Sequence, residues 1–229
     1  MSIQRALVIG AGSGVGRATA SALTAAGAEV LAAGRERDAT DPEQVAALIA
    51  EADPDLVVVA AGTRPRMASI EEHTWESFSA PWNVDVKIAF EVGRAALARP
   101  LRPNSTVVIV SSGAGVNVNG SPLSGGYAGA KRMQMFLAGY LQRAADAREL
   151  GIRFVALAPL QLLVGTAIGE AAAAAYGPEA GESAEAFMNS WPVPLDPAGV
   201  ARAILSVASG EEHPEATVLG VTGKGLEVI

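Results

Sequence analysis

Two side chains that could move a proton together lie four residues apart near the middle of the chain. Tyr127 and Lys131 fall within a helical pattern, and residues four apart on a helix share one face, so the phenol and the ammonium should be neighbours. Ser112 adds a hydroxyl just after the apolar run Thr106 to Val110. A Tyr-x-x-x-Lys pattern also arises by chance on solvated helix faces. The three residues therefore indicate acid–base chemistry only if a second signal accompanies them.

That second signal is a glycine turn near the N-terminus. The apolar run Ala6 to Ile9 meets Gly10, Gly14 and Gly16 and passes directly into a helical pattern. A strand, a tight turn and a helix in this order are typical of the start of a dinucleotide-binding βαβ unit. Glycines let a pyrophosphate approach the backbone N–H groups, and the helix N-terminus adds partial positive charge. The spacing is G-x-x-x-G-x-G rather than G-x-G-x-x-G, so an ordinary strand–turn–helix is the alternative at this point.

Strand and helix patterns alternate along the whole chain. We expect strands at 6–9, 29–33, 56–61, 106–110, 153–158 and 217–221. We expect helices after the glycine turn, from Asp41 and Pro42, near Trp75 and Phe78, at about 85–98, around Tyr127, and at 167–176, 182–189 and 197–208. The capping-box pattern of Ser69 and Glu72 should open the helix near Trp75. The alternation predicts a single-domain, Rossmann-type, doubly wound parallel sheet over residues 1–229, with helices on both faces.

Composition excludes several partners. The chain has 229 residues, a net charge of −7 and no cysteine, which argues against binding to nucleic acid or an anionic membrane and excludes disulfides and cysteine catalysis. The apolar window 154–176 is interrupted by Pro159 and Glu170, so we interpret it as a buried strand and an alanine-rich helix rather than a membrane span. No signal-peptide pattern is visible, which predicts the cytoplasm. His73 and His213 lack ligand-spaced partners, so no metal site is predicted.

On these motifs the chain resembles the short-chain dehydrogenase/reductases over essentially its whole length. The glycines match the family's cofactor turn, and Ser112, Tyr127 and Lys131 match its catalytic serine, tyrosine and lysine. The resemblance implies that Tyr127 exchanges a proton with the substrate oxygen as general acid/base, that Lys131 binds the nicotinamide ribose and favours the ionised phenol, and that Ser112 holds the substrate oxygen. It also implies a homodimer or homotetramer formed through the two long helices.

Further positions follow from the same resemblance. The predicted cofactor-binding residues are Gly10, Gly12, Ser13, Gly14, Val15, Gly16, Arg35, Asp38, Ala61, Gly62, Lys131, Pro159 and Thr166. The fourth catalytic position, an asparagine in the family, falls on Asp85, with Asn83 as the alternative. The other departures from the family pattern are Ile9, Val59, Ala60 and Leu160. The short link from Arg35 to Asp38 implies that the family's second helix and most of its third strand are missing.

The end of the second strand bears on the choice of cofactor. An acid at this place reads the ribose 2′-hydroxyl of NAD. Here Gly34 is followed by Arg35, whose guanidinium can hold a 2′-phosphate. The cofactor is therefore predicted to be NADP, with NAD kept open because Glu36 is adjacent.

The leading hypothesis is an NADP-dependent oxidoreductase that acts on a small-molecule carbonyl compound or secondary alcohol. The alternative is a non-catalytic NADP-binding sensor or regulatory protein on the same fold. A sugar-nucleotide epimerase or dehydratase would need a larger substrate domain than the roughly 70 residues after Pro159 provide. Those residues include a segment, about 160–191, that is predicted to be a mobile substrate lid lined by Met188 and Trp191.

Overall fold

The computed structural model describes residues 3–117 and 121–229. One sheet of seven strands has the order β2-β1-β3-β4-β5-β6-β7. Its strands are β1 (Arg5–Ile9), β2 (Glu29–Ala33), β3 (Leu56–Val59), β4 (Thr106–Val110), β5 (Arg153–Pro159), β6 (Val218–Thr222) and β7 (Gly225–Val228). Neighbouring strands from β2 to β6 are parallel, and β7 pairs antiparallel with β6. The predicted doubly wound sheet is confirmed. Strand β7 was not predicted, because this edge strand is largely exposed and carries no buried apolar run.

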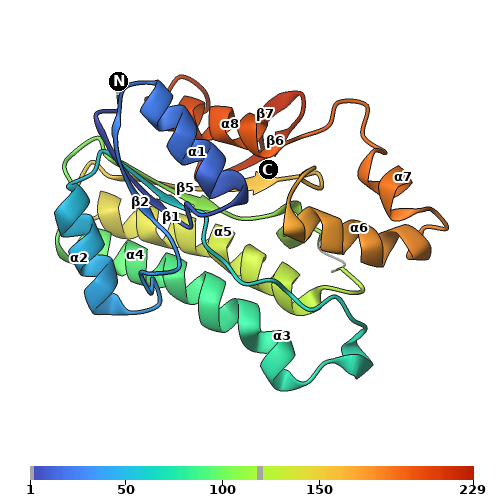
Figure 1. The fold of residues 1–229 in the computed structure, drawn as a ribbon. Coiled ribbons are helices and arrows are strands. Elements are labelled where there is room, and N and C mark those ends of the chain that lie inside the picture. The colour runs from blue at the N-terminus through green and yellow to red at the C-terminus, as the bar shows by residue number, and fades with distance from the viewer. Residues whose placement is uncertain (1–2, 118–120) are drawn as a thin grey trace.

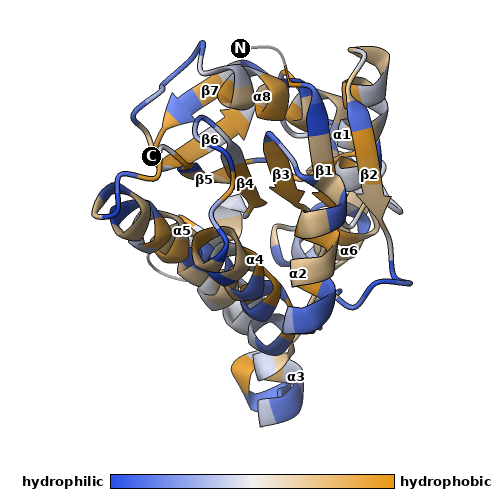
Figure 2. Ribbon diagram, turned by 90° about the vertical axis from the view of Figure 1, so that its left-hand side faces the viewer, coloured by the Kyte–Doolittle hydropathy of each residue, from blue (hydrophilic) through white to orange (hydrophobic). Residues whose placement is uncertain are grey.

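Helices cover both faces of the sheet (Figure 1). They are α1 (Gly14–Ala25), α2 (Pro42–Ala52), α3 (Trp75–Pro81), α4 (Lys87–Ala98), α5 (Gly125–Asp146), α6 (Ala167–Glu179), α7 (Ala184–Met188) and α8 (Pro197–Ser209). Successive strand residues point to opposite faces, so Leu7 and Ile9 of β1 join the core under α2, α4 and α5. Ala6 and Val8 join the core under α1 and α8. Figure 2 shows the central strands as hydrophobic, between these two groups of helices.

Residues 34–55 connect β2 to β3 through a single helix, α2. In the described stretch 34–55 the chain forms α2 and no strand. Asp41 accepts hydrogen bonds from the N–H groups of Glu43 and Gln44, and Pro42 occupies the first helical position. The predicted start of this helix is confirmed.

Residues 75–98 form one continuous helical stretch, whereas two separate helices were predicted. Between α3 and α4 lies a π-helical turn, η2 (Trp82–Val86). Pro81 lacks the N–H group that would continue the α-helical ladder, and the widened turn follows it directly. The capping box at Ser69 and Glu72 is present, but it opens a short 3₁₀ turn, and Thr74 caps α3 instead.

The apolar window 154–176 consists of most of β5, a connecting segment and most of α6. Of the helices in the described part of the chain, none combines the length and the hydropathy that crossing a membrane requires.

Candidate active site

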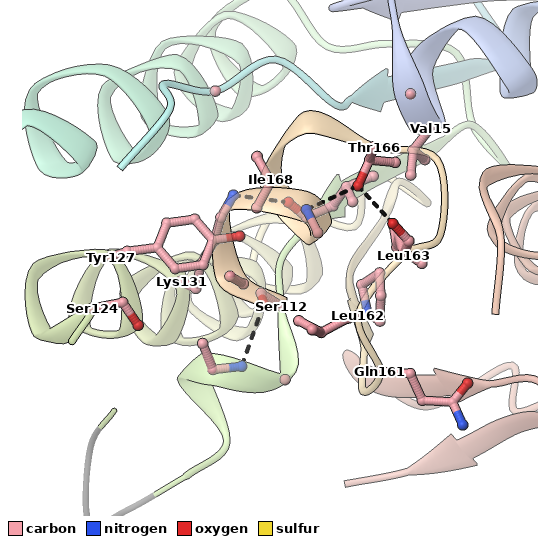
Figure 3. Close-up of a pocket in the computed structure, with 18 of the residues that line it drawn as sticks. Val15, Ser112, Ser124, Tyr127, Lys131, Gln161, Leu162, Leu163, Thr166 and Ile168 are labelled. Carbon is pink, nitrogen blue, oxygen red and sulfur yellow. Dashed lines mark hydrogen bonds between the residues drawn. The ribbon is translucent and has the colours of Figure 1, made fainter. Parts of the chain in front are cut away.

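A cavity of about 650 Å³ lies where the carboxyl ends of β3, β4 and β5 meet the start of α1. In an open parallel sheet this crevice is the usual place for a ligand. The structure brings together here the predicted residues Ser13, Gly14, Val15, Ala61, Gly62, Asp85, Ser112, Tyr127, Lys131, Pro159 and Thr166. Figure 3 shows Ser112, Tyr127 and the segment that carries Thr166 around the same space. Five predicted cofactor residues, Gly10, Gly12, Gly16, Arg35 and Asp38, do not line it.

The glycine turn fits a dinucleotide for two separate reasons. Gly10 has a φ of +90°, and a Cβ there would meet the backbone of Ala61, while a Cβ on Gly16 would meet the carbonyl of Gly10. These two glycines allow the turn itself to pack. A Cβ on Gly12 would meet nothing within 4 Å, so the turn is open on that side. The Ser13 side chain forms no cap hydrogen bond with the described residues. The first N–H groups of α1 therefore remain available to a phosphate.

Lys131 and Asp85 form a buried ion pair that lines the cavity. The Lys131 Nζ lies 3.1 Å from Asp85 Oδ2, and the two side chains are 7% and 1% exposed. The same Nζ donates to Gln134 Oε1 at 3.1 Å and to the Val110 carbonyl at 3.3 Å. An ammonium group has three N–H donors, and three acceptors surround this one. A ribose hydroxyl held by Lys131 must therefore share or displace one of them.

Asp85 is fixed from several directions. It belongs to the η2 turn, its Oδ1 accepts the N–H of Thr63 at 2.7 Å, and its backbone carbonyl accepts a hydrogen bond from Gln134 Nε2 at 3.0 Å. A Cβ on Gly62 would lie 2.7 Å from Asp85 Oδ2. The carboxylate thus needs a glycine beside it. Gly62 therefore has a steric role in addition to its predicted role in cofactor binding.

Tyr127 and Ser112 complete the predicted set. Tyr127 is buried, and Lys131 Nζ lies 5.4 Å from the centre of its ring, so the predicted shared helix face is observed. Ser112 Oγ accepts the N–H of Ala114 at 3.3 Å, which is a strand-end cap. Ser111 Oγ donates to the Lys131 carbonyl at 2.8 Å and so ties the end of β4 to α5.

The two candidates for the fourth catalytic position differ clearly. Asp85 is buried and touches Lys131. Asn83 is exposed, and its Nδ2 donates to Ser79 Oγ at 3.3 Å. Of the two residues, the geometry favours Asp85.

The residues after β2 lie outside the cavity. Arg35 is exposed and forms no hydrogen bond or ion pair with any described residue. The Glu36 carboxylate folds back to accept the N–H of Gly34 at 2.7 Å, and hydrogen bonds from the N–H groups of Glu36 and Gly34 lower its pKa. The side chain and then the N–H of Thr40 donate to Asp38 and lower the pKa of its carboxyl. Asp38 remains a predicted cofactor-binding residue.

Sequence reasoning assigned no role to several residues that shape the site, among them Thr63, Ser124, Gln134 and Tyr176. Gln134 follows Lys131 by three residues, so helical spacing could have placed it on the same face. Tyr176 of α6 and Ser124 share a hydrogen bond between their hydroxyls at 2.9 Å. No local pattern signals that contact, because 52 residues separate its partners. Thr63 acts through its backbone N–H, which its side-chain type does not reveal.

The two residues predicted to line the lid differ in their position relative to the cavity. Trp191 lines the cavity, whereas Met188 does not. Thr166 caps α6: its hydroxyl accepts the N–H of Gly169 at 3.1 Å and donates to the Leu163 carbonyl at 2.8 Å. No group of three or more histidine or acidic residues within metal-binding reach occurs in residues 3–117 and 121–229.

Comparison with known proteins gives a family match and fold matches. The model of the NAD-dependent epimerase/dehydratase family matches residues 6–157. No curated protein matches the sequence significantly. A short-chain dehydrogenase from Mycobacterium avium is 24% identical, with a TM-score of 0.73 over 99% of this chain and 84% of that one.

Two further solved structures contain a nucleotide. A short-chain dehydrogenase from Burkholderia cenocepacia in complex with NADP is 21% identical, with a TM-score of 0.76 over 96% of both chains. An NAD⁺-bound xylitol dehydrogenase is 19% identical, with a TM-score of 0.77 over 96% of this chain and 98% of that one. At these identities the likeness establishes the fold.

Proposed function

The chain belongs to the NAD-dependent epimerase/dehydratase family, and from this premise we propose that it is an NAD(P)-dependent oxidoreductase that interconverts a carbonyl compound and a secondary alcohol. One observation carries the proposal. Tyr127 and Lys131 share one face of α5 and line the same cavity as the open start of α1. A proton donor and a phosphate-binding helix terminus therefore meet in one space, as hydride transfer to a carbonyl requires.

Each residue has a defined task in this scheme. The bound nicotinamide dinucleotide supplies the hydride for reduction and accepts it in oxidation. Tyr127 gives the carbonyl oxygen its proton in reduction and takes that proton back in oxidation. Ser112 Oγ, at the end of β4, donates a hydrogen bond that holds the same oxygen. Lys131 provides positive charge beside the phenol, and the Asp85 carboxylate, 3.1 Å away, partly offsets that charge.

The proposed cofactor preference is NADP. Arg35 is exposed and unpaired among the described residues, so its guanidinium is available to a 2′-phosphate. The carboxylate of the neighbouring Glu36 already accepts a hydrogen bond from the Gly34 N–H. We expect Arg35→Ala to weaken the binding of NADPH by at least about tenfold and that of NADH little, since one charge-assisted contact with phosphate is lost. Isothermal titration with both cofactors measures this, and equal losses would argue against the preference.

The experiment for the proposed function is the Tyr127→Phe variant. Turnover of a ketone that the wild type reduces should fall by at least about 10²-fold, the usual scale for a general acid–base. The affinity for NADPH should remain. Tyr140→Phe is the matched control, because Tyr140 lies on the same helix with its side chain 57% exposed. Unchanged turnover in Tyr127→Phe would refute the assignment.

A non-catalytic dinucleotide-binding role is the alternative, in which the site would bind the cofactor without turning over a substrate. All three N–H donors of Lys131 already have protein acceptors. Tight NADPH binding without oxidation of NADPH by any carbonyl compound would support this candidate. An epimerase or dehydratase, which the family name includes, would convert its substrate without net consumption of NADPH, so the same assay separates it.

We also propose that the protein forms homodimers or homotetramers through α4 and α5. Both helices carry exposed aromatic side chains, namely Phe90, Phe136 and Tyr140, and the last two are stacked. A second copy of the chain would cover such a surface. Phe136→Glu should lower the mass measured by light scattering, while a monomeric wild type would refute the proposal.

A further inference from the structure

The two ends of the cavity differ in charge. Among its described lining residues, the charged ones are Arg17, Asp85 and Lys131. Asp85 and Lys131 neutralise each other, and Arg17 belongs to α1 at the glycine-turn end. The described lining residues after β4 and β5, apart from Lys131, are uncharged. The residues between the two described ranges, 118–120, carry no charge in the sequence.

Three aromatic side chains from the predicted lid line the uncharged end. Tyr176 lies on α6, Phe187 on α7 and Trp191 just after α7. The Tyr176 and Phe187 rings are stacked with centroids 6.5 Å apart, and the Phe187 and Trp191 rings meet edge to face at 6.4 Å. Leu162 and Ile168 line the same cavity and are labelled in Figure 3. These residues form an apolar wall, which we call the aromatic wall after Tyr176, Phe187 and Trp191.

The aromatic wall is tied to the helix that carries the proton donor. The Tyr176 hydroxyl lies 2.9 Å from Ser124 Oγ and accepts the N–H of Leu123 at 3.3 Å. Ser124 precedes α5 and stands three residues before Tyr127. Because its hydroxyl is occupied by these partners, Tyr176 offers a substrate mainly the face or edge of its ring. A molecule that reaches Tyr127 with its reactive oxygen can therefore pack its remainder against the aromatic wall.

We infer, on the basis of the proposed oxidoreductase function, that the substrate is an uncharged ketone or secondary alcohol bearing a ring or bulky hydrocarbon group that packs on the aromatic wall. A carboxylate or phosphate would lose its water there without gaining a cation, which opposes binding. Aromatic rings reward a ring-bearing ligand through burial of apolar surface and edge or stacked contacts.

A matched series of ketones tests the inference. Methyl para-acetylbenzoate and para-acetylbenzoate share the same aryl ketone and differ in charge. With NADPH, kcat/KM for the neutral ester should exceed that for the anion by at least about 100-fold, the scale on which a site rejects a group it leaves unpaired. Equal or better reduction of the anion would overturn the inference while leaving the oxidoreductase function intact.

Binding is measured separately from turnover. Isothermal titration calorimetry of the protein–NADP⁺ complex with each ketone shows whether the ester binds more tightly than the anion. A neutral ketone that binds but is never reduced would support the substrate class and contradict the proposed function. If neither the ester nor unsubstituted acetophenone binds or reacts, the proposed substrate class is contradicted.

Paired tryptophan variants locate the effect. Trp191→Ala should raise KM for the neutral aryl ketone by at least about tenfold and leave the affinity for NADPH nearly unchanged. Trp75→Ala is the matched control, because Trp75 on α3 is 78% exposed and does not line the cavity. If Trp191→Ala leaves KM for the neutral aryl ketone unchanged, or if Trp75→Ala raises it equally, the aromatic wall does not select the substrate.

Discussion

The α5–η2 region and the α6–α7 region border the same cavity but are held in opposite ways. In the first, Asp85 and Gln134 are each only 1% exposed, and hydrogen bonds and an ion pair connect them with Lys131. In the second, none of the residues of α7 is buried, and those of α6 that are buried are glycine and alanine. The proton-handling residues are therefore fixed by polar contacts, and the residues proposed to contact the substrate lie on a lightly anchored arm.

This difference separates two requirements of a catalyst. Proton transfer needs fixed geometry, which a buried charge pair provides as long as both partners are present. Admission of a substrate needs a part that can move, and segments with little buried apolar surface open at low cost in free energy. We therefore keep the proposal that residues 160–191 act as a lid.

The largest expected effect is on the α5–η2 region. Lys131→Met should lower the free energy of unfolding by about 3–5 kcal/mol, because it leaves the buried Asp85 carboxylate without its ammonium partner. Adding Asp85→Asn should restore most of that stability but none of the activity. Urea unfolding and a ketone reduction assay measure the two quantities. If Lys131→Met alone were as stable as the wild type, the ion pair between Asp85 and Lys131 would not stabilise this region.

Removal of Gln134 should have a smaller effect. Gln134→Leu leaves a Lys131 donor and the Asp85 carbonyl unpaired, so we expect a loss of about 1–3 kcal/mol in the free energy of unfolding. As a positioning residue, Gln134 should affect kcat more than KM. Gln134→Glu keeps the acceptor for Lys131 but loses the donor to Asp85, so it should recover part of kcat. An unchanged kcat in Gln134→Leu would show that Gln134 is not a positioning residue.

The α6–α7 region should respond more mildly. Tyr176→Phe removes the hydroxyl that binds Ser124 and Leu123, worth about 0.5–1.5 kcal/mol. Hydrogen exchange at 160–191 should accelerate by up to about tenfold, while α5 beyond its first turn should exchange as in the wild type. Exchange slowed or unchanged at 160–191 would show that this contact does not hold the arm.

Much of the fold could be predicted from the sequence because its signals are local. The β-branched run in β3, the glycines before α1 and the Asp41–Pro42 helix start each specify structure through neighbouring residues. The resemblance to the short-chain dehydrogenase/reductases rested on such motifs, and the family match and the fold confirm it.

What could not be predicted depends on residues far apart in the sequence. Asp85 was aligned to a catalytic position, but its contacts with Thr63 and Lys131 arise from three separate elements and from the π turn after Pro81. The link between Tyr176 and Ser124 likewise exists only once α6 lies beside the start of α5. Local patterns locate the reactive side chains, and tertiary structure determines what surrounds them.

The most direct test of the central claim follows the hydride itself. NADPH carrying deuterium at both positions of the hydride-donating carbon of its nicotinamide is incubated with the protein and a neutral aryl ketone, and the alcohol is examined by mass spectrometry. The proposed mechanism predicts one deuterium on the carbinol carbon, formed at least about 10²-fold more slowly by Tyr127→Phe and at the wild-type rate by Tyr140→Phe. Alcohol without deuterium, or transfer by Tyr127→Phe at the wild-type rate, would contradict it.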